Sequence, residues 1–72
     1  MKISTVNIVE YYEDTVIGVT SFTNDEEGNK EAEEAFGKII TDNGAHTDDI
    51  AGCIEECFYE QGTYQAFLIV SL

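Results

Sequence analysis

The sequence predicts one α+β domain, a two-layer sandwich of ββααβ order with a three-stranded, mainly antiparallel sheet and two helices on one face. Three observations lead to this fold class. The chain has 72 residues, which is enough for a single domain spanning 1–72. Hydrophobic residues make up 43 % of it, more than acidic disordered chains contain. Finally, the pattern of apolar residues is that of strands up to Thr23, of helices through the middle, and of a strand from Tyr64.

The two N-terminal strands are expected over residues 3–12 and 15–23, because both segments are rich in β-branched and aromatic residues. Glu13 and Asp14 separate the two segments, which indicates a hairpin. This pair lacks the glycine that two-residue turns prefer, so we expect a longer or bulged turn. Gly18 interrupts the second strand and indicates either a bulge or a position of close packing.

The first helix is expected to follow this hairpin. Residues 24–27 supply an N-cap and an acidic first turn, although Gly28 weakens the start and moves the cap as late as Asn29. Residues 43–44, Asn-Gly, are typical of a helix C-terminus. The apolar stripe of this helix consists of Ala32, Ala35, Phe36, Ile39 and Ile40.

A second helix and a final strand complete the predicted fold. The helix starts near Thr47 and ends at Gly62, and residues 64–72 form the strand. Residues 66–70 are apolar on both faces, which predicts cover on both sides. The final strand either pairs with the second strand or lies parallel beside the first. The apolar stripe of the second helix consists of Ile50, Cys53, Ile54, Cys57 and Phe58.

Both faces of the predicted sheet are apolar, whereas two helices can cover only one of them. An exposed apolar sheet face often marks an interface, although such residues also suit half-exposed strands. The sequence therefore leaves open a homodimer or a protein partner on this face. Strict alternation groups Val6 with Ile8 against Ile3, Val9 and Tyr11, then Val16 with Phe22 against Ile17 and Val19, and finally Tyr64, Leu68 and Val70 against Phe67 and Ile69.

Charge is the property that says most about partners. Fifteen acidic residues stand against three lysines and no arginine, which gives a formal net charge of −12. Repulsion from phosphates excludes direct nucleic-acid binding, while a basic protein surface would attract the chain. No apolar stretch is long enough to span a membrane and no secretion signal is visible, so we expect no membrane partner and a cytoplasmic location.

The residues that could hold a metal or perform catalysis have plainer explanations. Cys53 and Cys57 lie four apart after His46, but a structural zinc site would need a second ligand pair. Both cysteines also fall on the apolar stripe, which predicts core thiols, and their parallel directions on one helix exclude a disulfide. His46 is expected in a loop. Residues around Gly28 only faintly resemble a calcium loop. We expect no cofactor, no metal and no catalytic residue.

The acidic residues differ between the two predicted helices. The first helix pairs Glu26 with Lys30 and Glu34 with Lys38 at the favourable four-residue spacing. The second helix has no basic residue, so its acids form a surface of one sign together with Asp42. The predicted partner-binding residues on the outer face of this second helix are Asp48, Asp49, Glu55, Glu56, Tyr59 and Glu60.

These observations predict a small acidic, non-enzymatic protein-binding module. It would dock on a basic protein surface, as an inhibitor or as a nucleic-acid-mimicking regulator of the kind that phages and mobile elements use. The alternative is a homodimeric structural or assembly protein that pairs through the free face of its sheet. Plain solubility and adaptation to high salt are two further explanations of the charge.

Overall fold

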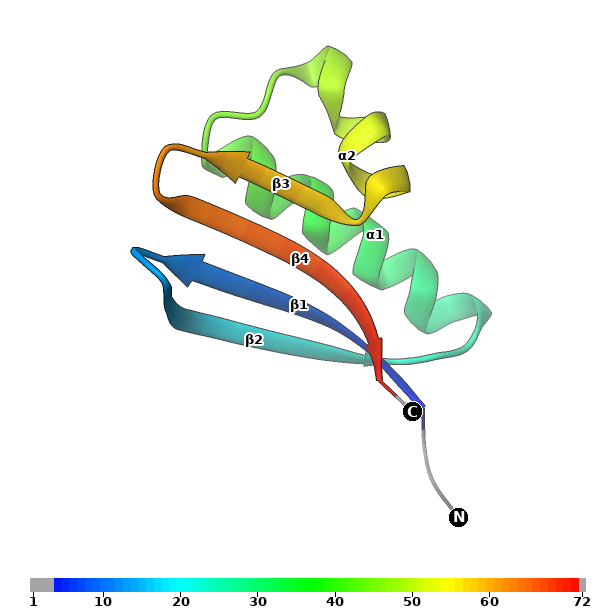
Figure 1. Ribbon diagram of the computed structural model, residues 1–72. Coiled ribbons are helices and arrows are strands. Elements are labelled where there is room, and N and C mark those ends of the chain that lie inside the picture. The colour runs from blue at the N-terminus through cyan, green and yellow to red at the C-terminus, as the bar shows by residue number, and fades with distance from the viewer. Residues whose placement is uncertain (1–3, 72) are drawn as a thin grey trace.

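The computed structural model describes residues 4–71 and confirms an α+β fold (Figure 1). Within this range the element order is ββααββ, with a short 3-10 helix, η1, before the second α-helix. The four strands form one antiparallel sheet in the order β2-β1-β4-β3. The predicted three-stranded sheet of ββααβ order is therefore wrong. The elements are β1 (Thr5–Tyr12), β2 (Thr15–Thr23), α1 (Glu26–Asp42), η1 (Thr47–Asp49), α2 (Ile50–Glu56), β3 (Phe58–Gln61) and β4 (Tyr64–Ser71).

The additional strand, β3, replaces the last part of the predicted second helix. The α2 helix ends at Glu56, and Cys57 adopts the left-handed conformation (φ 61°) that ends a helix. Phe58–Gln61 then pairs with β4, and Tyr59 lies opposite Ala66. Strand alternation turns Tyr59 into the core, where it is only 8 % exposed. Burial of this aromatic ring favours the strand over a longer helix in solvent.

β3 also determines where the last strand lies. Because β3 reverses the chain before β4 begins, β4 runs antiparallel to β1 and lies on the side of β1 away from β2. Both predicted arrangements, beside the second strand or parallel to the first, are therefore wrong. The predicted cover on both faces of β4 is wrong, because the helices cover one face only, and they cover it best near the start of the strand. Ala66 is fully buried there, whereas Ile69 and Val70 are 45 % and 55 % exposed.

The β1–β2 turn consists of only two residues, so the expected longer turn is wrong. Glu13 and Asp14 both have positive φ angles, 51° and 66°, as a tight hairpin turn requires. Glutamate does not favour this conformation and aspartate adopts it less readily than glycine, so the left-handed non-glycine residues cost about 1 kcal/mol each. The backbone N–H of Glu13 donates to the carbonyl oxygen of Thr63 (3.1 Å), which ties this turn to the β3–β4 turn.

We expect Glu13→Asn/Asp14→Gly to raise the free energy of unfolding by about 1–2 kcal/mol, because Asn-Gly adopts the turn conformation without strain. Removal of two negative charges also reduces repulsion. A Glu13→Gln/Asp14→Gln variant controls for this effect, since it removes the same charges without the preferred turn residues. Urea denaturation followed by circular dichroism measures both. Equal stabilisation by the two variants would contradict strain in the turn.

The predicted bulge is present in β2, next to Gly18. Glu10 lies opposite Gly18 while Tyr11 lies opposite Val16, so Ile17 is the additional residue. The bulge places Val16 in register with Tyr11, on the sheet face away from the helices. The predicted grouping of Val16 with Phe22 is therefore wrong, because strict alternation does not continue through a bulge. Ile3, which is predicted on the same face as Val9, lies outside the described residues.

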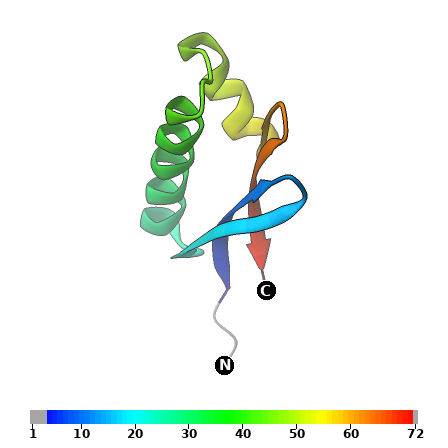
Figure 2. The ribbon, with the colours of Figure 1, turned by 90° about the vertical axis from the view of Figure 1, so that its left-hand side faces the viewer.

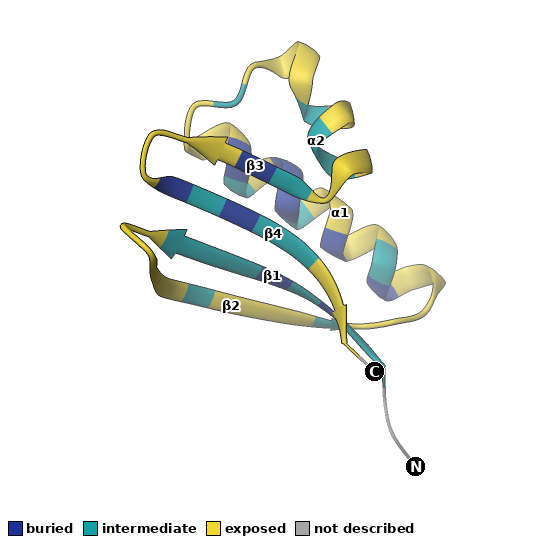
Figure 3. Ribbon diagram, in the orientation of Figure 1, coloured by how far each residue is buried: buried dark blue, intermediate teal, exposed yellow. Residues whose placement is uncertain are grey.

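The core lies between the sheet and the two helices, which pack on the same side (Figures 2 and 3). The α1 helix contacts β1 and β2, and α2 packs against α1 and β3. Ile50, Cys53 and Ile54 of α2 contact the main cluster, which joins the second helix to the core. The buried residues of this cluster are Ile8, Phe36, Ile40, Tyr59, Tyr64 and Ala66.

The start of α1 is held close to the end of β2. Asp25 is the N-cap, and its side chain accepts a hydrogen bond from the backbone N–H of Gly28 (2.6 Å). Gly28 is buried against Thr23, so this glycine permits a close approach of strand and helix. The helix ends at the predicted position, with Asn43 as its C-cap. Neither helix in residues 4–71 is both long and apolar enough to cross a membrane.

Candidate functional site

A cleft of about 760 Å³ lies between the η1–α2 segment and β3. It is open to solvent, and its lining is acidic on both sides. We call it the acidic cleft. Its lining residues are Gly44, Ala45, His46, Asp48, Asp49, Gly52, Cys53, Glu56, Phe58, Tyr59, Glu60 and Gln61.

The turn at Cys57 brings the two walls of the acidic cleft together. Asp48 and Asp49 lie in η1 and Glu56 lies at the end of α2, while Glu60 lies in β3. Because the chain leaves α2 at Cys57 and continues as a strand beside it, acids from both sides of this turn line one space. Four acidic residues therefore line a cleft in which no lining residue is a lysine or an arginine, and the carboxylate of Glu60 also accepts a hydrogen bond from Gln65.

Tyr59 forms a rigid part of the cleft wall. Its hydroxyl donates to the carbonyl oxygen of Asn43 (3.2 Å) and also contacts Oε1 of Gln61. Burial raises the pKa of the Tyr59 hydroxyl above its ordinary value, with a smaller contribution from Cys53. Gly44 has a φ of 102°, and a Cβ there would lie 2.8 Å from Oε1 of Gln61. The loop after α1 thus packs directly against β3.

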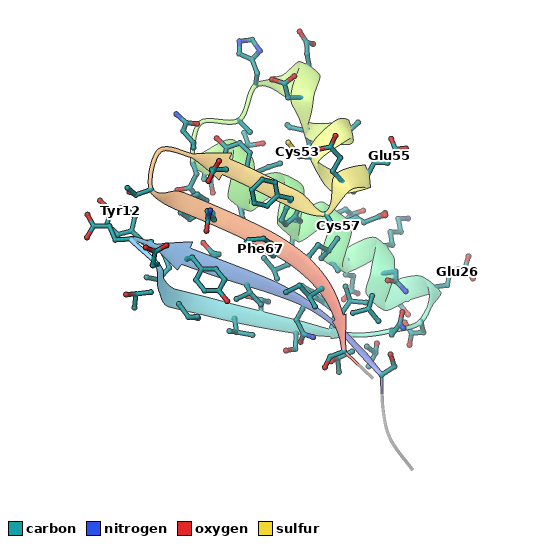
Figure 4. The ribbon with its side chains drawn as sticks, in the orientation of Figure 1. Tyr12, Glu26, Cys53, Glu55, Cys57 and Phe67 are labelled. Carbon is teal, nitrogen blue, oxygen red and sulfur yellow. The ribbon has the colours of Figure 1, made fainter. Side chains whose placement is uncertain are left out.

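The structure brings together five of the six predicted partner-binding residues. Asp48, Asp49, Glu56, Tyr59 and Glu60 all line the acidic cleft, whereas the exposed Glu55 does not (Figure 4). Two details of the prediction are wrong, because Tyr59 and Glu60 belong to β3 rather than to a helix, and Tyr59 is buried. His46, Phe58 and Gln61 also line the cleft, and the positions of Phe58 and Gln61 depend on the unpredicted strand.

The two cysteines have different environments. Cys53 is half-buried and packs on the core, as predicted. Cys57 is exposed, so its prediction as a core thiol is wrong: the chain leaves the helix there and the stripe ends. Both thiols are free. Burial, together with the negative charges of Asp49 and Glu56, raises the pKa of the Cys53 thiol above its ordinary value.

We expect iodoacetamide at about pH 8 to alkylate Cys57 at least roughly tenfold faster than Cys53, because the reactive species is the exposed thiolate. The raised pKa of Cys53 keeps its thiol protonated at this pH, and its side chain is partly buried, which limits access of the reagent. The single-thiol variants Cys53→Ser and Cys57→Ser allow each rate to be measured by mass spectrometry. Equal rates in the folded variants would contradict the two environments described here.

Metal ligands do not converge in the acidic cleft. Among residues 4–71, no group of three or more histidine, cysteine, aspartate or glutamate side chains is placed to hold a metal ion. The acidic residues of the cleft come from η1, α2 and β3. Such an arrangement suits an extended cationic ligand better than a compact ion.

A second surface lies on the sheet face that the helices leave uncovered, which Figure 1 shows from the front. The strand register places Val19 beside Val9, Val9 beside Phe67, and Phe67 beside Phe58. These four residues form one line across all four strands, which we call the apolar row. Phe67 packs against Phe58 (5.1 Å between ring centroids) and edge-on against Tyr11 (5.6 Å).

The two surfaces differ in charge. Eleven of the fifteen acidic residues lie between Asp25 and Glu56, in and around the helices. Among the described strand residues, only Glu10 and Glu60 carry a carboxylate. Glu10 lies on the helix side of the sheet, where it accepts a hydrogen bond from the Tyr64 hydroxyl (2.8 Å). Burial, this hydrogen bond and the charge of Glu10 raise the pKa of Tyr64.

Comparison of the chain with protein-family models, with curated proteins and with solved structures finds no match. The geometry of the acidic cleft and of the apolar row therefore carries the functional argument.

Proposed function

We propose that the protein is a non-enzymatic protein-binding module whose acidic cleft takes up a basic segment of another protein. One observation carries this proposal: four acidic residues, from segments on both sides of the Cys57 turn, line a single open cleft without a basic residue among them. A lysine or arginine side chain in this cleft would be attracted from both walls. Because the four acidic residues are exposed, dissolved ions screen this attraction, which makes it dependent on salt.

The cleft also fits the apolar part of a basic side chain. Lysine and arginine carry an aliphatic stem below the charged group, and such stems pack along apolar surfaces. Phe58 and Tyr59 are the aromatic residues among those that line the cleft, and they give its β3 wall an apolar component. A volume of about 760 Å³ is larger than one side chain needs, so the ligand is a segment with several basic residues.

This chemistry suits an inhibitor or regulator of a nucleic-acid-binding protein. The basic groove of such a protein is built to receive phosphates, and an array of carboxylates presents the same sign of charge. The raised pKa of the Cys53 thiol works against a nucleophilic role for the one cysteine that lines the cleft. Binding, and not catalysis, is the function that the cleft supports.

Titration with a fluorescein-labelled octalysine peptide tests the proposal. Fluorescence anisotropy is expected to show binding at about 50 mM NaCl and a loss of affinity of at least about tenfold at 500 mM NaCl, because ions screen the attraction. An octaserine peptide of equal length is the control and is expected not to bind. Absence of octalysine binding at the low salt concentration, or an affinity independent of salt, would contradict the proposal.

A further inference from the structure

The uncovered sheet face carries an inference that does not rest on the acidic cleft. We infer that this face pairs with the same face of a second copy of the chain, so that two sheets pack against each other as a homodimer. The apolar row lies at the centre of the face. Val19 is 60 % exposed there, and Ile69, next to the row on β4, is 45 % exposed. Asn7 and Ser21 flank the row toward one end of the strands, and Glu60 and Gln65 flank it toward the other.

The polar rim is neutral on most sides and largely satisfied by its own hydrogen bonds. Ser21 Oγ donates to Asn7 Oδ1 (2.6 Å), and Asn7 Nδ2 donates to Thr5 Oγ1 (3.2 Å). At the opposite end, Gln65 Nε2 donates to Glu60 Oε2 (2.8 Å). An apolar centre with a hydrogen-bonded polar rim is the usual anatomy of a protein–protein interface.

The distribution of charge favours a second copy of the chain over a basic protein as the partner of this face. A basic partner would find few carboxylates to bind here, because most of the acids lie in and around the helices on the other side. A second copy of a chain with a net charge of −12 is repelled at the helical side. The sheet face is where two copies can approach with their acidic layers pointing in opposite directions.

The apolar row is complementary to itself. Its two valines lie on β2 and β1 and its two phenylalanines on β4 and β3, so one half is small and the other large. A twofold axis along the strands, between β1 and β4, places Val9 and Val19 opposite the partner's Phe67 and Phe58. Each large side chain then faces a small one. Alternation of large and small residues gives close packing between two sheets, which lie about 10 Å apart.

The same axis separates the charged turns. The two hairpin turns lie side by side, since the Glu13 N–H donates to the carbonyl oxygen of Thr63 (3.1 Å). Rotation about the axis exchanges these positions and places the acidic Glu13–Asp14 turn over the partner's neutral Gly62–Thr63 turn. Like charges therefore do not meet at this end of the dimer.

The area of the face is sufficient for a dimer. Four strands span about 19 Å, and an eight-residue strand is about 27 Å long. Because β3 has only four residues, the flat area is about 450 Å², and side-chain relief raises the accessible area toward the lower end of the range of reversible interfaces. A dimer held by this area is reversible and depends on protein concentration.

Light scattering with size-exclusion chromatography tests the dimer. The wild-type chain at about 0.5 mM is expected to approach twice its 8.0 kDa mass, and added salt is expected to strengthen the dimer by screening repulsion. Val19→Lys is expected to weaken association roughly a hundredfold or more, because it places an unpaired charge in the apolar row. A monomeric wild type in high salt would overturn the inference.

The Val70→Lys variant is the matched control. Val70 is as exposed as Val19 (55 % against 60 %), but it pairs with Val6, and its side chain lies on the helix side of the sheet. Both variants change the net charge equally, so only the face differs. Circular dichroism confirms folding of each. Equal loss of the dimer in the two variants would overturn the assignment of this face.

Isotope-filtered NMR on a mixed dimer tests the axis. The proposal predicts intermolecular contacts between the Val19 methyl groups and the ring of the partner's Phe58. Within one chain these residues lie on opposite edge strands, three strand spacings or about 14 Å apart. Contacts between Val19 and the partner's Val19 would instead overturn the proposed axis.

Discussion

Replacement of Gly28 by alanine is expected to remove most of the stability of the protein, whereas Gly37→Ala in the same helix is expected to leave it nearly unchanged. Both glycines are buried in α1. A Cβ at Gly28 would lie 1.9 Å from the carbonyl oxygen of Thr23 and 2.8 Å from its carbonyl carbon, so the backbone itself would have to move. At Gly37 the nearest atom would be Ile50 Cγ2 at 3.4 Å, which is an ordinary contact.

The two substitutions therefore differ in their expected free energies. Separation of β2 from the start of α1 is expected to cost more than about 3 kcal/mol, since overpacking against backbone is not relieved by a side-chain rotation. A domain of this size has about 5 kcal/mol of stability at most. Gly37→Ala combines a gain in helix propensity with a close contact and is expected to stay within about 1 kcal/mol of wild type. Urea denaturation followed by circular dichroism measures both, and equal losses would contradict this explanation.

Glu56→Lys is expected to reduce octalysine binding by at least about tenfold, whereas Glu55→Lys is expected to change it by less than about threefold. The two residues are adjacent in α2 and exposed, and each substitution changes the net charge equally. Only Glu56 lines the acidic cleft. A lysine at position 56 adds a positive charge beside the bound peptide, while a lysine at position 55 points away from it (Figure 4).

Comparison of Glu55→Lys with Glu56→Lys distinguishes binding in the acidic cleft from attraction to the net charge of the protein. If the peptide responded only to the net charge of −12, the two variants would weaken binding equally. An equal response would favour the explanation that the acids serve solubility. A Glu56→Gln variant, which removes the charge without adding a new one, is expected to lie between wild type and Glu56→Lys.

The sequence predicts α1 well because several local signals agree there. The apolar stripe with Phe36 at its centre, the acidic first turn and the Asn43–Gly44 end all indicate the same helix. The requirement for a glycine at position 28 could not be predicted, since it depends on contact with Thr23 of the preceding strand. Propensity alone treats this glycine as a weakness, although the fold requires it.

β3 was missed because its sequence satisfies two patterns. Cys57 and Phe58 continue the helical stripe of Ile50 and Ile54, which conceals the strand. A signal for the strand is nevertheless present: adjacent aromatic residues precede a Gly62 turn and the aromatic start of β4, as in a hairpin. Burial of Tyr59 in the core decides between the two patterns. This burial depends on tertiary contacts, so it cannot be predicted from the local sequence.

The sequence predicts most of the acidic residues of the candidate site, but it does not predict that they line a cleft. Acids near the second helix could be found from the absence of basic residues after Lys38. Their arrangement around a cleft could not be found, because Glu60 reaches it only through β3. Glu55, which the sequence groups with Glu56, belongs to α2 and lies outside the cleft. The apolar row likewise depends on the register of four strands and on the bulge at Ile17.

The central claim is that the acidic cleft, and not the acidic surface as a whole, binds basic segments. Titration of ¹⁵N-labelled protein with unlabelled octalysine, followed by amide chemical shifts, tests it most directly. The claim predicts that the largest shifts fall in residues 44–61, where the cleft-lining residues lie, while those of the acidic residues 31–34 of α1 stay small. Shifts of equal size along α1 and around the cleft would contradict it.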